Sequence, residues 1–379
     1  MANFLVNGLK SKTGGGKSIL KSYLTHLASD TDEHIYYILT PDHDEYAEFN
    51  SNRMKILETP RYFSKNSLFP FLYYYYFPKL MKNLRIDAIL NYGDIIIRGS
   101  TPQLYLFDWP FGSHPDSVAW DRLDRRDYLY SKVKLFMFER NMKYADIVMA
   151  QSQVTMDRLK AIYGIERLEI LPNAVSLDNF SDKNRKNFGL PADRIKCLYI
   201  TYYYTHKNIE VFLDIAKIIR AKNLNYALVT TIAAEQHRGA ARFLEQVHAE
   251  GLEDIIVNVG PVHGSEIASL FDQCDALLMP TLLESFSGSY VEAMHHQKPI
   301  FTSKLDFAEV VCGDAAFYFD PLDPEKIVAA LVHAFADSQR IADAADRGTA
   351  RLAGMWNWEM VYARTQELLK SLLTTPAIA

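Results

Sequence analysis

Residues 276–303, ALLMPTLLESFSGSYVEAMHHQKPIFTS, constrain the fold more than any other stretch of the chain. A short apolar run over residues 276–279 ends at Pro280, which is typical of a buried strand in a parallel sheet. Residues 285–289 are small or flexible except Phe286, and residues 290–296 then favour a helix. This order leaves unpaired backbone N–H groups and the positive end of a helix dipole above the strand. It therefore predicts an anion-binding site.

Two carboxylates, Glu284 and Glu292, bracket this loop, and we expect Glu292 in the first turn of the helix. A carboxylate beside a phosphate would repel it, so these groups are better suited to accept hydrogen bonds from sugar hydroxyls. Glu292 has a second interpretation, because Ser289-x-x-Glu292 is also a capping box that would only close the helix N-terminus. Glu284 at the end of a buried strand is costly unless something binds it, which favours a functional role.

The stretch resembles the donor half of the retaining family 4 glycosyltransferases of group 1, which have the GT-B fold. The likeness rests on Glu284-x7-Glu292, Ala293-Met294, Lys298-Pro299 and the DPLDP of residues 320–324, in this order and spacing. It implies that Glu284 is a catalytic residue that orients the donor sugar, that loop amides hold the diphosphate, and that Glu292 binds the ribose hydroxyls. The donor-binding residues implied here are Ser285, Phe286, Ser287, Gly288, Ser289 and Glu292. Ser285 and Ser287 stand where the family usually has Gly, which narrows the choice of sugar.

The length of 379 residues exceeds one ordinary hydrophobic core. Hydrophobic residues make up 49% and charged residues 23%, so the composition excludes a disordered chain. We expect an α/β protein with two Rossmann-like, doubly wound domains, which the resemblance implies face each other across a cleft. The predicted parts are an acceptor-binding domain over 1–178, a nucleotide-sugar-binding domain over 179–355, and a helix over 356–379 that crosses back to the first domain.

Three cysteines lie far apart without a CxxC pair, which favours a reduced, cytoplasmic protein. We predict neither a signal peptide nor a membrane-spanning segment. However, seven Lys or Arg and one acid lie between Arg53 and Arg85, around the aromatic run LFPFLYYYYFP. This pattern favours a peripheral contact of residues 62–85 with the inner face of the cytoplasmic membrane. The alternative is that the tyrosines pack in the core.

In the N-terminal half, residues 3–7, 36–40, 86–91 and 103–107 are predicted strands. A glycine-rich loop over 10–17 precedes a predicted helix over 18–28, and the resemblance implies that Gly15 and Gly16 approach the donor phosphates. Gly14-Gly15-Gly16-Lys17-Ser18 also suggests a P-loop ATPase, but Ser11 stands where that pattern needs Gly.

Asp108 follows the predicted strand 103–107, at an edge where parallel sheets bind ligands, and is a candidate catalytic residue. The family often has a His directly before this Asp, and Phe107 occupies that place. His114 is therefore an acceptor-side candidate, with an ordinary surface histidine as the alternative. Asn173, in a turn that resembles the family's Pro-Asn-Gly-Val and marks the hinge between domains, is the other acceptor-side candidate.

In the C-terminal half, strands are predicted over 196–201, 227–232 and 255–259, and a helix over 266–276. The resemblance implies that Lys207 neutralises the donor diphosphate and that Val262 lies at the nucleobase. Tyr202 occupies the position of the family's second phosphate-binding cation, an Arg.

These residues predict a retaining, metal-independent glycosyltransferase. Its donor would be a UDP- or GDP-linked mannose, glucose, galactose or N-acetylhexosamine, and its acceptor a glycan or a polyprenyl-diphosphate-linked glycan in bacterial surface polysaccharide or lipopolysaccharide O-antigen assembly. We expect no cofactor, no metal and no nucleic-acid partner; Asp42-x-Asp44 has metal-motif spacing but lies in a predicted solvated loop. A P-loop ATPase and a nucleotide-sugar binder without activity stay open as alternatives, the latter because of Phe107 and Tyr202. Base, sugar, acceptor, linkage and oligomeric state are not determined by the sequence.

Overall fold

The computed structural model describes residues 1–12, 14–64, 68–174 and 186–374, and the chain divides into two compact units. The first unit comprises residues 1–114, 124–174 and 356–379, and the second comprises residues 115–123 and 175–355. The predicted boundary between residues 178 and 179 lies outside the described residues. The sequence did not predict that residues 115–123 belong to the second unit. Among the described residues, no helix is both long and apolar enough to cross a bilayer.

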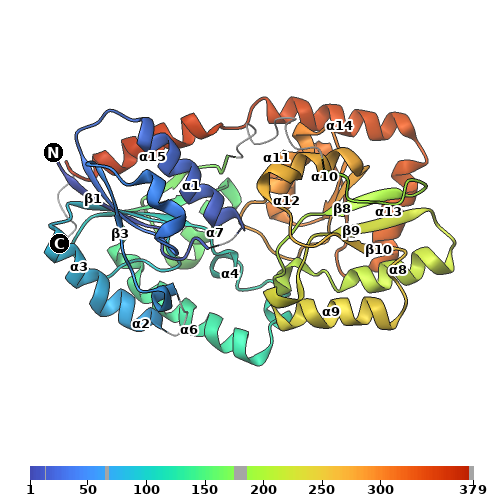
Figure 1. Cartoon of the computed structure of the whole chain (residues 1–379), viewed down its shortest axis with the longest axis horizontal. Coiled ribbons are helices and arrows are strands. Elements are labelled where there is room, and N and C mark those ends of the chain that lie inside the picture. Colours follow the sequence, from blue (N-terminus) through green and yellow to red (C-terminus); the bar gives the residue numbers. More distant parts are fainter. Residues whose placement is uncertain (13, 65–67, 175–185, 375–379) are drawn as a thin grey trace. The chain divides into compact units, whose positions relative to one another are not determined.

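The first unit contains a seven-stranded parallel sheet in the order β3-β2-β1-β4-β5-β6-β7 (Figure 1). Its apolar strands are buried on both faces, which is why they are nearly continuous hydrophobic runs. The strands predicted over 3–7 and 103–107 have these bounds in the structure, and the others differ by one or two residues at their ends. The strands are β1 (Asn3–Asn7), β2 (Ile35–Leu39), β3 (Met54–Leu57), β4 (Ala88–Asn91), β5 (Gln103–Phe107), β6 (Ile147–Ala150) and β7 (Leu168–Ile170).

Helices cover both faces of this sheet, as the alternating sequence pattern predicts. They are α1 (Gly14–Ser29), α2 (Phe69–Phe71), α3 (Phe77–Leu84), α4 (Pro110–Ser113), α6 (Arg125–Asn141), α7 (Gln153–Tyr163) and α15 (Trp358–Ser371), with short turns η1 (Asp44–Phe49), η2 (Arg61–Ser64), η4 (Leu72–Tyr76) and η5 (Met142–Tyr144). The helix predicted over 18–28 begins earlier, at Gly14, because first-turn N–H groups need no intrahelical partner and glycine is tolerated there. Asp124 starts α6 by accepting hydrogen bonds from the backbone N–H groups of Arg126 and Asp127.

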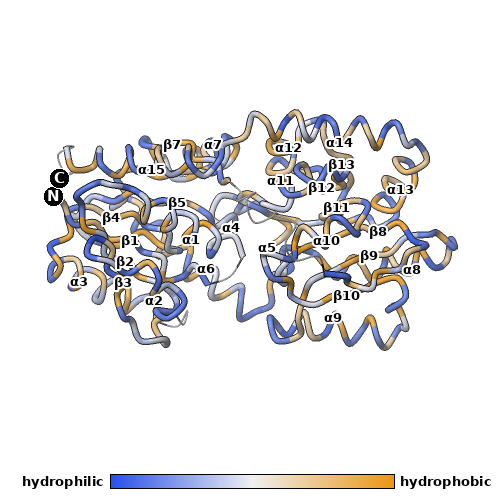
Figure 2. Tube along the Cα trace, turned by 45° about the horizontal axis from the view of Figure 1, so that its top comes forward, coloured by the Kyte–Doolittle hydropathy of each residue, from blue (hydrophilic) through white to orange (hydrophobic). Residues whose placement is uncertain are grey.

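The second unit has a six-stranded parallel sheet in the order β10-β9-β8-β11-β12-β13. Counted from its own first strand this is 3-2-1-4-5-6, the doubly wound order, so the predicted fold class is confirmed. Its strands are β8 (Ile195–Tyr199), β9 (Tyr226–Thr230), β10 (Ile256–Asn258), β11 (Ala276–Met279), β12 (Ile300–Ser303) and β13 (Ala316–Phe319). Figure 2 shows hydrophobic residues concentrated on the strands of both sheets.

The helices of the second unit pack around this sheet and bury one large apolar cluster. Asp323, in the DPLDP stretch, caps α13 by accepting from the backbone N–H of Lys326. The helices are α5 (Ala119–Arg122), α8 (Val211–Ala221), α9 (Arg238–Ala249), α10 (Ile267–Gln273), α11 (Gly288–His295), α12 (Asp306–Cys312), α13 (Pro324–Phe335) and α14 (Ser338–Leu352), with turns η7 (Thr205–Lys207), η8 (Ala234–Gln236), η9 (Gly264–Glu266) and η10 (Gly313–Ala315).

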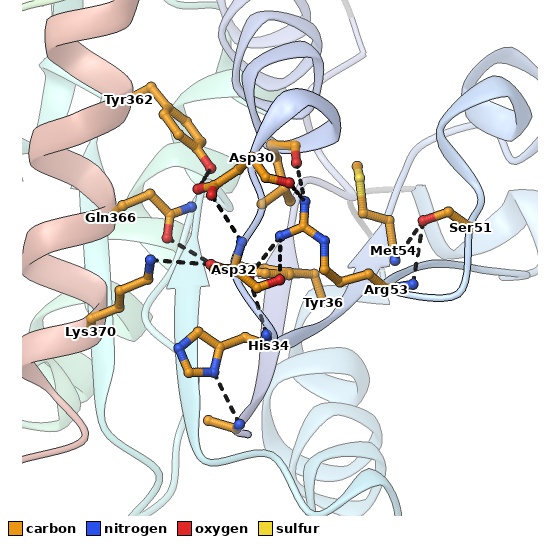
Figure 3. Close-up of polar contacts among 12 residues, drawn as sticks. Asp30, Asp32, His34, Tyr36, Ser51, Arg53, Met54, Tyr362, Gln366 and Lys370 are labelled. Carbon is orange, nitrogen blue, oxygen red and sulfur yellow. Dashed lines mark hydrogen bonds and ion pairs between the residues drawn. The ribbon is translucent and has the colours of Figure 1, made fainter.

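The final helix, α15, packs within the first unit, where Trp358, Val361 and Leu369 join the cluster under the sheet. Its polar anchor is Asp32, whose carboxylate oxygens lie 2.6 Å from Arg53 Nη1 and 3.1 Å from Lys370 Nζ (Figure 3). Burial alone would raise the pKa of Asp32, but hydrogen bonds from Tyr36, Lys370 and Arg53 outweigh burial and lower it. The carboxylate therefore stays ionised and ties α15 to the strand edge.

Residues 62–85, except 65–67, which lie outside the described residues, form α2, a π-helical turn η4 and α3. Tyr73 is buried in an apolar cluster, and Tyr74 and Tyr76 are partly buried against it. Only Tyr75 of the four consecutive tyrosines is exposed. Arg53 also points inward to Asp32 instead of joining the basic surface. Membrane contact through this segment stays a prediction, with Tyr62, Phe71 and Tyr75 as exposed aromatic residues in its described part.

Candidate functional site

The centre of the second sheet is the point where the strand order reverses. β8 and β11 are neighbours, and the chain leaves them toward opposite sides of the sheet. In open parallel sheets the crevice beyond the carboxyl ends of such strands is where ligands bind. Lys207 lies in the segment after β8, and Glu284 lies in the segment after β11. The topology therefore brings two predicted site residues, 77 positions apart in the sequence, to one place.

Lys207 Nζ and Glu284 Oε1 form an ion pair. The side chains are only 14% and 9% exposed, and Thr281 Oγ1 donates a second hydrogen bond of 3.3 Å to the same carboxylate oxygen. A buried ion pair loses hydration of both charges, so it is weak evidence for a purely stabilising role. Instead, an anionic ligand that binds the lysine would release the carboxylate to accept hydrogen bonds from another part of the ligand.

The turn that carries Lys207 is held in place by backbone-directed hydrogen bonds. Asn208 Nδ2 donates to the carbonyls of Pro280 (3.1 Å) and Pro321 (2.9 Å), and Tyr199 Oη donates to the carbonyl of Lys207 (2.9 Å). Asn208 has a left-handed φ of 56°, a conformation that asparagine tolerates better than most residues. Asn208 thus fixes η7 against the end of β11, and the DPLDP stretch contributes one of its acceptors. This fixes the lysine next to the glutamate.

Beyond Glu284, the small-residue loop leads into the N-terminus of α11. Ser287 is the N-cap, and its side chain accepts no N–H from the helix; its Oγ lies 4.0 Å from Met279 Sδ. The backbone N–H groups of Gly288 and Ser289 therefore begin the helix in the orientation that suits an anion. The helix predicted over residues 290–296 begins two residues earlier, at Gly288. Ser289 is not its N-cap, so the capping box given as the alternative role of Glu292 does not form.

Glu292 lies in the second turn of α11 and not in the first. Its side chain is half-buried, and burial raises its pKa to about 7. Near neutral pH the carboxyl group is therefore divided between its protonated and ionised forms, unlike an exposed glutamate. A strongly shifted carboxyl beside an anion-binding helix terminus is a candidate for ligand contact.

Two further positions of the expected donor site, Tyr202 and Val262, have different surroundings. Tyr202 lies 5.2 Å from the ring centroid of Tyr204, which stacks on His206. Burial, with a smaller contribution from Lys207, lowers the pKa of His206 to about 3, so this histidine does not supply the missing positive charge. Val262, the predicted nucleobase contact, packs at the edge of the apolar cluster after Gly260, whose φ is 73°.

Residues 115–123 add a part of this region that sequence reasoning missed. Ser117 Oγ donates to the carbonyl of Leu282 (3.4 Å), and α5 packs against η7. Trp120 is buried. The segment therefore buttresses the turn of Lys207 and the loop before Glu284. Its one sequence signal was a single aromatic residue, Trp120, within the stretch PDSVAWDRL.

The first sheet reverses its order between β1 and β4, and charged residues also gather at its carboxyl edge. Lys134 Nζ of α6 lies 2.8 Å from Asp94 Oδ1, after β4, and 4.3 Å from the centroid of the Trp109 ring. Burial and then Asp94 raise the pKa of Asp108 to about 7, while Lys134 opposes this shift. On the other side of the reversal, burial lowers the pKa of Lys10 to about 8. Asp108 thus lies in a charged cluster, and its catalytic role stays a prediction.

The remaining candidates of the first unit fall into different surroundings. His114 is buried, not on the surface, with Nδ1 2.8 Å from Ser113 Oγ. Phe107 is a core residue whose ring centroid lies 5.5 Å from that of Phe138, so its side chain fills space that an imidazole would leave partly empty. Asn173 is half-buried at the end of the described residues that follow β7.

Gly15 and Gly16 lie in the first turn of α1 and not in a loop. A Cβ at Gly15 would meet no atom within 4 Å, so packing in the chain itself does not require glycine there. Lys17 Nζ lies 2.5 Å from Glu45 Oε1, whereas a P-loop lysine must be directed at phosphates. This pairing, together with Ser11, counts against the ATPase interpretation.

Comparisons with known proteins agree with the second unit most directly. A family model described as "Glycosyl transferases group 1" matches residues 194–337. This match covers less than half of the chain, and it shows that the second unit resembles the group 1 glycosyltransferases. Among curated relatives of this chain, a D-inositol 3-phosphate glycosyltransferase of Paenarthrobacter aurescens is 27% identical over 58% of this chain and 56% of its own length. The O-antigen chain mannosyltransferase RfbU of Salmonella typhimurium is 24% identical over 50% of this chain and 51% of its own length. The chain thus spans about half the length of these relatives.

Solved structures match this chain over nearly its full length. Sucrose-phosphate synthase from Thermosynechococcus elongatus superposes with a TM-score of 0.76 at 15% identity, covering 99% of this chain and 100% of its own. Anabaena Alr3699/HepE in complex with UDP-glucose gives 0.72 at 16% identity, covering 98% of this chain and 100% of its own. At such identities the likeness shows the fold, which is that of GT-B proteins.

Proposed function

We propose that the protein is a retaining, metal-independent glycosyltransferase that moves a sugar from a nucleotide-diphosphate donor to a glycan or lipid-linked acceptor. The observation that carries this proposal is the buried Lys207–Glu284 pair at the reversal point of the second sheet, beside the N-terminus of α11. The pair offers one cation for a diphosphate and one carboxylate for sugar hydroxyls. The helix terminus adds backbone donors for the second phosphate.

The chemistry follows from where charge develops. The bond between the sugar C1 and the diphosphate oxygen breaks, the acceptor oxygen bonds to C1 on the same face, and the acceptor proton passes to the departing diphosphate. Negative charge grows on the leaving diphosphate, and Lys207 with the amides of residues 288 and 289 stabilises it without a metal ion. Glu284 orients the sugar, and Glu292 binds the ribose. The loop Ser285, Phe286, Ser287 lines the donor path.

On the acceptor side we assign Asp108, with His114 and Asn173, to the first unit. The charged edge of that sheet, with Lys10 and the Asp94–Lys134 pair, suits a polar or phosphorylated acceptor. Similarity to an O-antigen mannosyltransferase supports a role in bacterial surface polysaccharide or lipopolysaccharide assembly. We further propose a cytoplasmic location with peripheral contact of residues 62–85 at the inner membrane face, through Phe71 and Tyr75.

The first test is thermal stabilisation of the purified chain by UDP, GDP, ADP, CMP and ATP, each with and without Mg²⁺. Stabilisation by UDP or GDP without metal supports the proposal and identifies the donor class, because a ligand that binds the folded state raises the melting temperature. Stabilisation by ATP only with Mg²⁺ would support the ATPase alternative.

A second test separates a transferase from a binder without activity. Labelled UDP- or GDP-sugars are incubated with polyprenyl-diphosphate-linked glycans, and NMR of the product reports the anomeric configuration. Transfer with the donor's configuration supports retention, and inversion contradicts it. Nucleotide binding without sugar transfer to any acceptor tried, and without hydrolysis of the donor, would favour the binder.

A further inference from the structure

The outward face of α6 carries large apolar side chains that the rest of the first unit leaves uncovered. Leu129, Val133 and Phe136 are 65%, 47% and 55% exposed. Their spacing of four and then three residues places them on one stripe of the helix. The rest of α6 is anchored in the core, with Phe138 buried opposite the stripe and Met137 buried along one edge of it, so the apolar stripe is not a packing defect.

Cations extend this apolar stripe at both ends. Arg126 and Arg140 continue the same three- and four-residue spacing, and the Arg140 guanidinium carbon lies 4.9 Å from the centroid of the Phe136 ring. Five cations and one acid make up the exposed charged residues between positions 125 and 143: Arg125, Arg126, Lys132, Glu139, Arg140 and Lys143. An apolar stripe with a basic border is typical of a helix that lies in a membrane interface.

The neighbouring helical segment of η4 and α3 has the same character. Tyr74 Oη donates to Asn141 Oδ1 of α6 (3.3 Å), and Tyr73, Phe77 and Met137 share one buried cluster, so the two segments lie side by side on one face of the sheet. Figure 1 shows α2, α3 and α6 along this side of the first unit. No acid occurs between residues 59 and 86, and Lys79 and Lys82 are exposed there. The neighbouring segment therefore adds positive charge beside α6 and contributes no acid that would neutralise it.

We propose that the exposed face of α6, defined by Arg126, Leu129, Val133, Phe136 and Arg140, is a docking surface for bilayers of anionic phospholipid. The helix would lie parallel to the membrane, with three apolar side chains at the level of the acyl boundary and the arginines at the phosphates. This surface is distinct from residues 62–85. Lipid binding by α6 does not depend on the transferase reaction.

Charge decides between a membrane and a second copy of the chain as the occupant. If two α6 stripes paired antiparallel, Arg126 of one chain would meet Arg140 of the other. In a parallel pair, each arginine would lie beside the same arginine of the second chain. Like charges across an interface oppose association. Three side chains also fall well short of the roughly 800 Å² per partner that a stable interface buries. An anionic membrane, in contrast, attracts each cation.

The test is co-sedimentation of the full chain with vesicles of phosphatidylcholine, with and without phosphatidylglycerol. We expect binding to the anionic vesicles that weakens at high salt. Leu129→Ser/Val133→Ser/Phe136→Ser should lose binding at least tenfold, because burial of these side chains supplies the apolar contribution. Arg126→Gln/Arg140→Gln should lose about thirtyfold on anionic vesicles and little on neutral ones, since each cation contributes about fivefold.

A matched control is Val332→Ser/Met360→Ser, which removes exposed apolar side chains of α13 and α15 and should bind like the unchanged chain. Circular dichroism checks that each variant is folded. If the triple variant does not fold, the variant Arg126→Gln/Arg140→Gln alone tests the proposal. Equal binding by the α6 variants and the unchanged chain would overturn the proposal. So would absence of binding to anionic vesicles, a loss seen only in Phe71→Ser/Tyr75→Ser, or a dimer in sedimentation velocity that the triple variant abolishes.

Discussion

The two sheets of this protein share one strand order but place different chemistry at their reversal points. In the second unit, Lys207 and Glu284 come from the loops that directly follow the two central strands. In the first unit, Asp94 follows a central strand, but its partner Lys134 comes from the middle of α6. The topology creates the same kind of crevice in both units, and the loops and helices around it decide what binds there.

This difference also explains where family likeness is concentrated. The donor-side charges sit in short segments whose spacing can be matched along the sequence, and the family model covers residues 194–337. The acceptor-side pair instead joins Asp94, in the segment after a strand, to Lys134 in the middle of a helix. We therefore expect the second unit to hold the common donor and the first to hold the particular acceptor.

The variant Glu284→Ala is the strongest test of the expectation that the second unit binds the donor. It removes the buried partner of Lys207 and the proposed sugar contact, so transfer should fall about 1,000-fold, in the range seen when a transition-state contact is deleted. Initial rates with a labelled donor measure the effect. The matched control is Glu325→Ala, which breaks the exposed ion pair of Lys222 with Glu325 (2.5 Å) and should leave the rate unchanged. Comparable rates in the two variants would remove Glu284 from the site.

Asp108→Asn tests the first unit separately. If Asp108 acts on the acceptor, kcat should fall about 10- to 100-fold, while the dissociation constant of the donor nucleotide stays the same. The pKa of about 7 sets the expected pH profile: Asp108 is increasingly ionised above pH 7, so activity of the unchanged enzyme should rise through that region. The variant should lack this rise. A weakened donor affinity instead would place Asp108 in the donor site.

Much of the fold could be predicted from the sequence because the central strands are apolar runs ended by breakers. β1, β5 and β11 have the bounds predicted from their residues alone. The sequence could not place residues 115–123 in the second unit, because that membership depends on tertiary contacts such as Ser117 with Leu282. The tyrosine run was ambiguous for the same reason: only packing shows that Tyr73 is in the core and Tyr75 is not.

The candidate site was predicted in outline but not in its detailed geometry. Glu284 and Lys207 were both singled out, yet their pairing follows from the strand order and not from their spacing. The capping box failed because Ser289-x-x-Glu292 fits two starting points of the helix, and the structure begins it at Ser287 and Gly288. Neither the Asp94–Lys134 pair nor the buried state of His114 has a local signature in the sequence.

Arg53→Ala examines the stability of the first unit without touching either crevice. Arg53 donates to Asp32 and to the carbonyls of Leu27 (2.6 Å) and Asp30 (2.5 Å), so its loss should lower the free energy of unfolding by about 2 kcal/mol. Urea unfolding measures the change. Arg347→Ala, at an arginine that bonds the carbonyl of Asp314 on the surface, is the control and should change stability by less than about 0.5 kcal/mol. Donor nucleotide binding by the second unit should be the same in both.

Glu292→Gln gives the smallest expected effect and sharpens the contrast within the donor site. The pKa of Glu292 rises from 4.5 to about 7 on folding, so between these values the folded state holds more protons than the unfolded state. Stability of the unchanged chain must therefore fall as pH rises from about 4.5 to 7, and the glutamine variant lacks this loss. We expect equal melting temperatures near pH 4.5 and an advantage of a few degrees for the variant above pH 7. Glu325→Gln should show no such trend.

The same variant should bind the donor nucleotide more weakly, because a neutral amide accepts hydrogen bonds from ribose hydroxyls less strongly than a carboxylate. Binding and stability then move in opposite directions above pH 7, as expected of a carboxyl group kept for a ligand at the expense of the fold. A melting temperature independent of pH would contradict the raised pKa. Unchanged nucleotide affinity would leave Glu292 as a buried carboxyl without a part in donor binding, and the donor site would then rest on Lys207, Glu284 and the helix terminus alone.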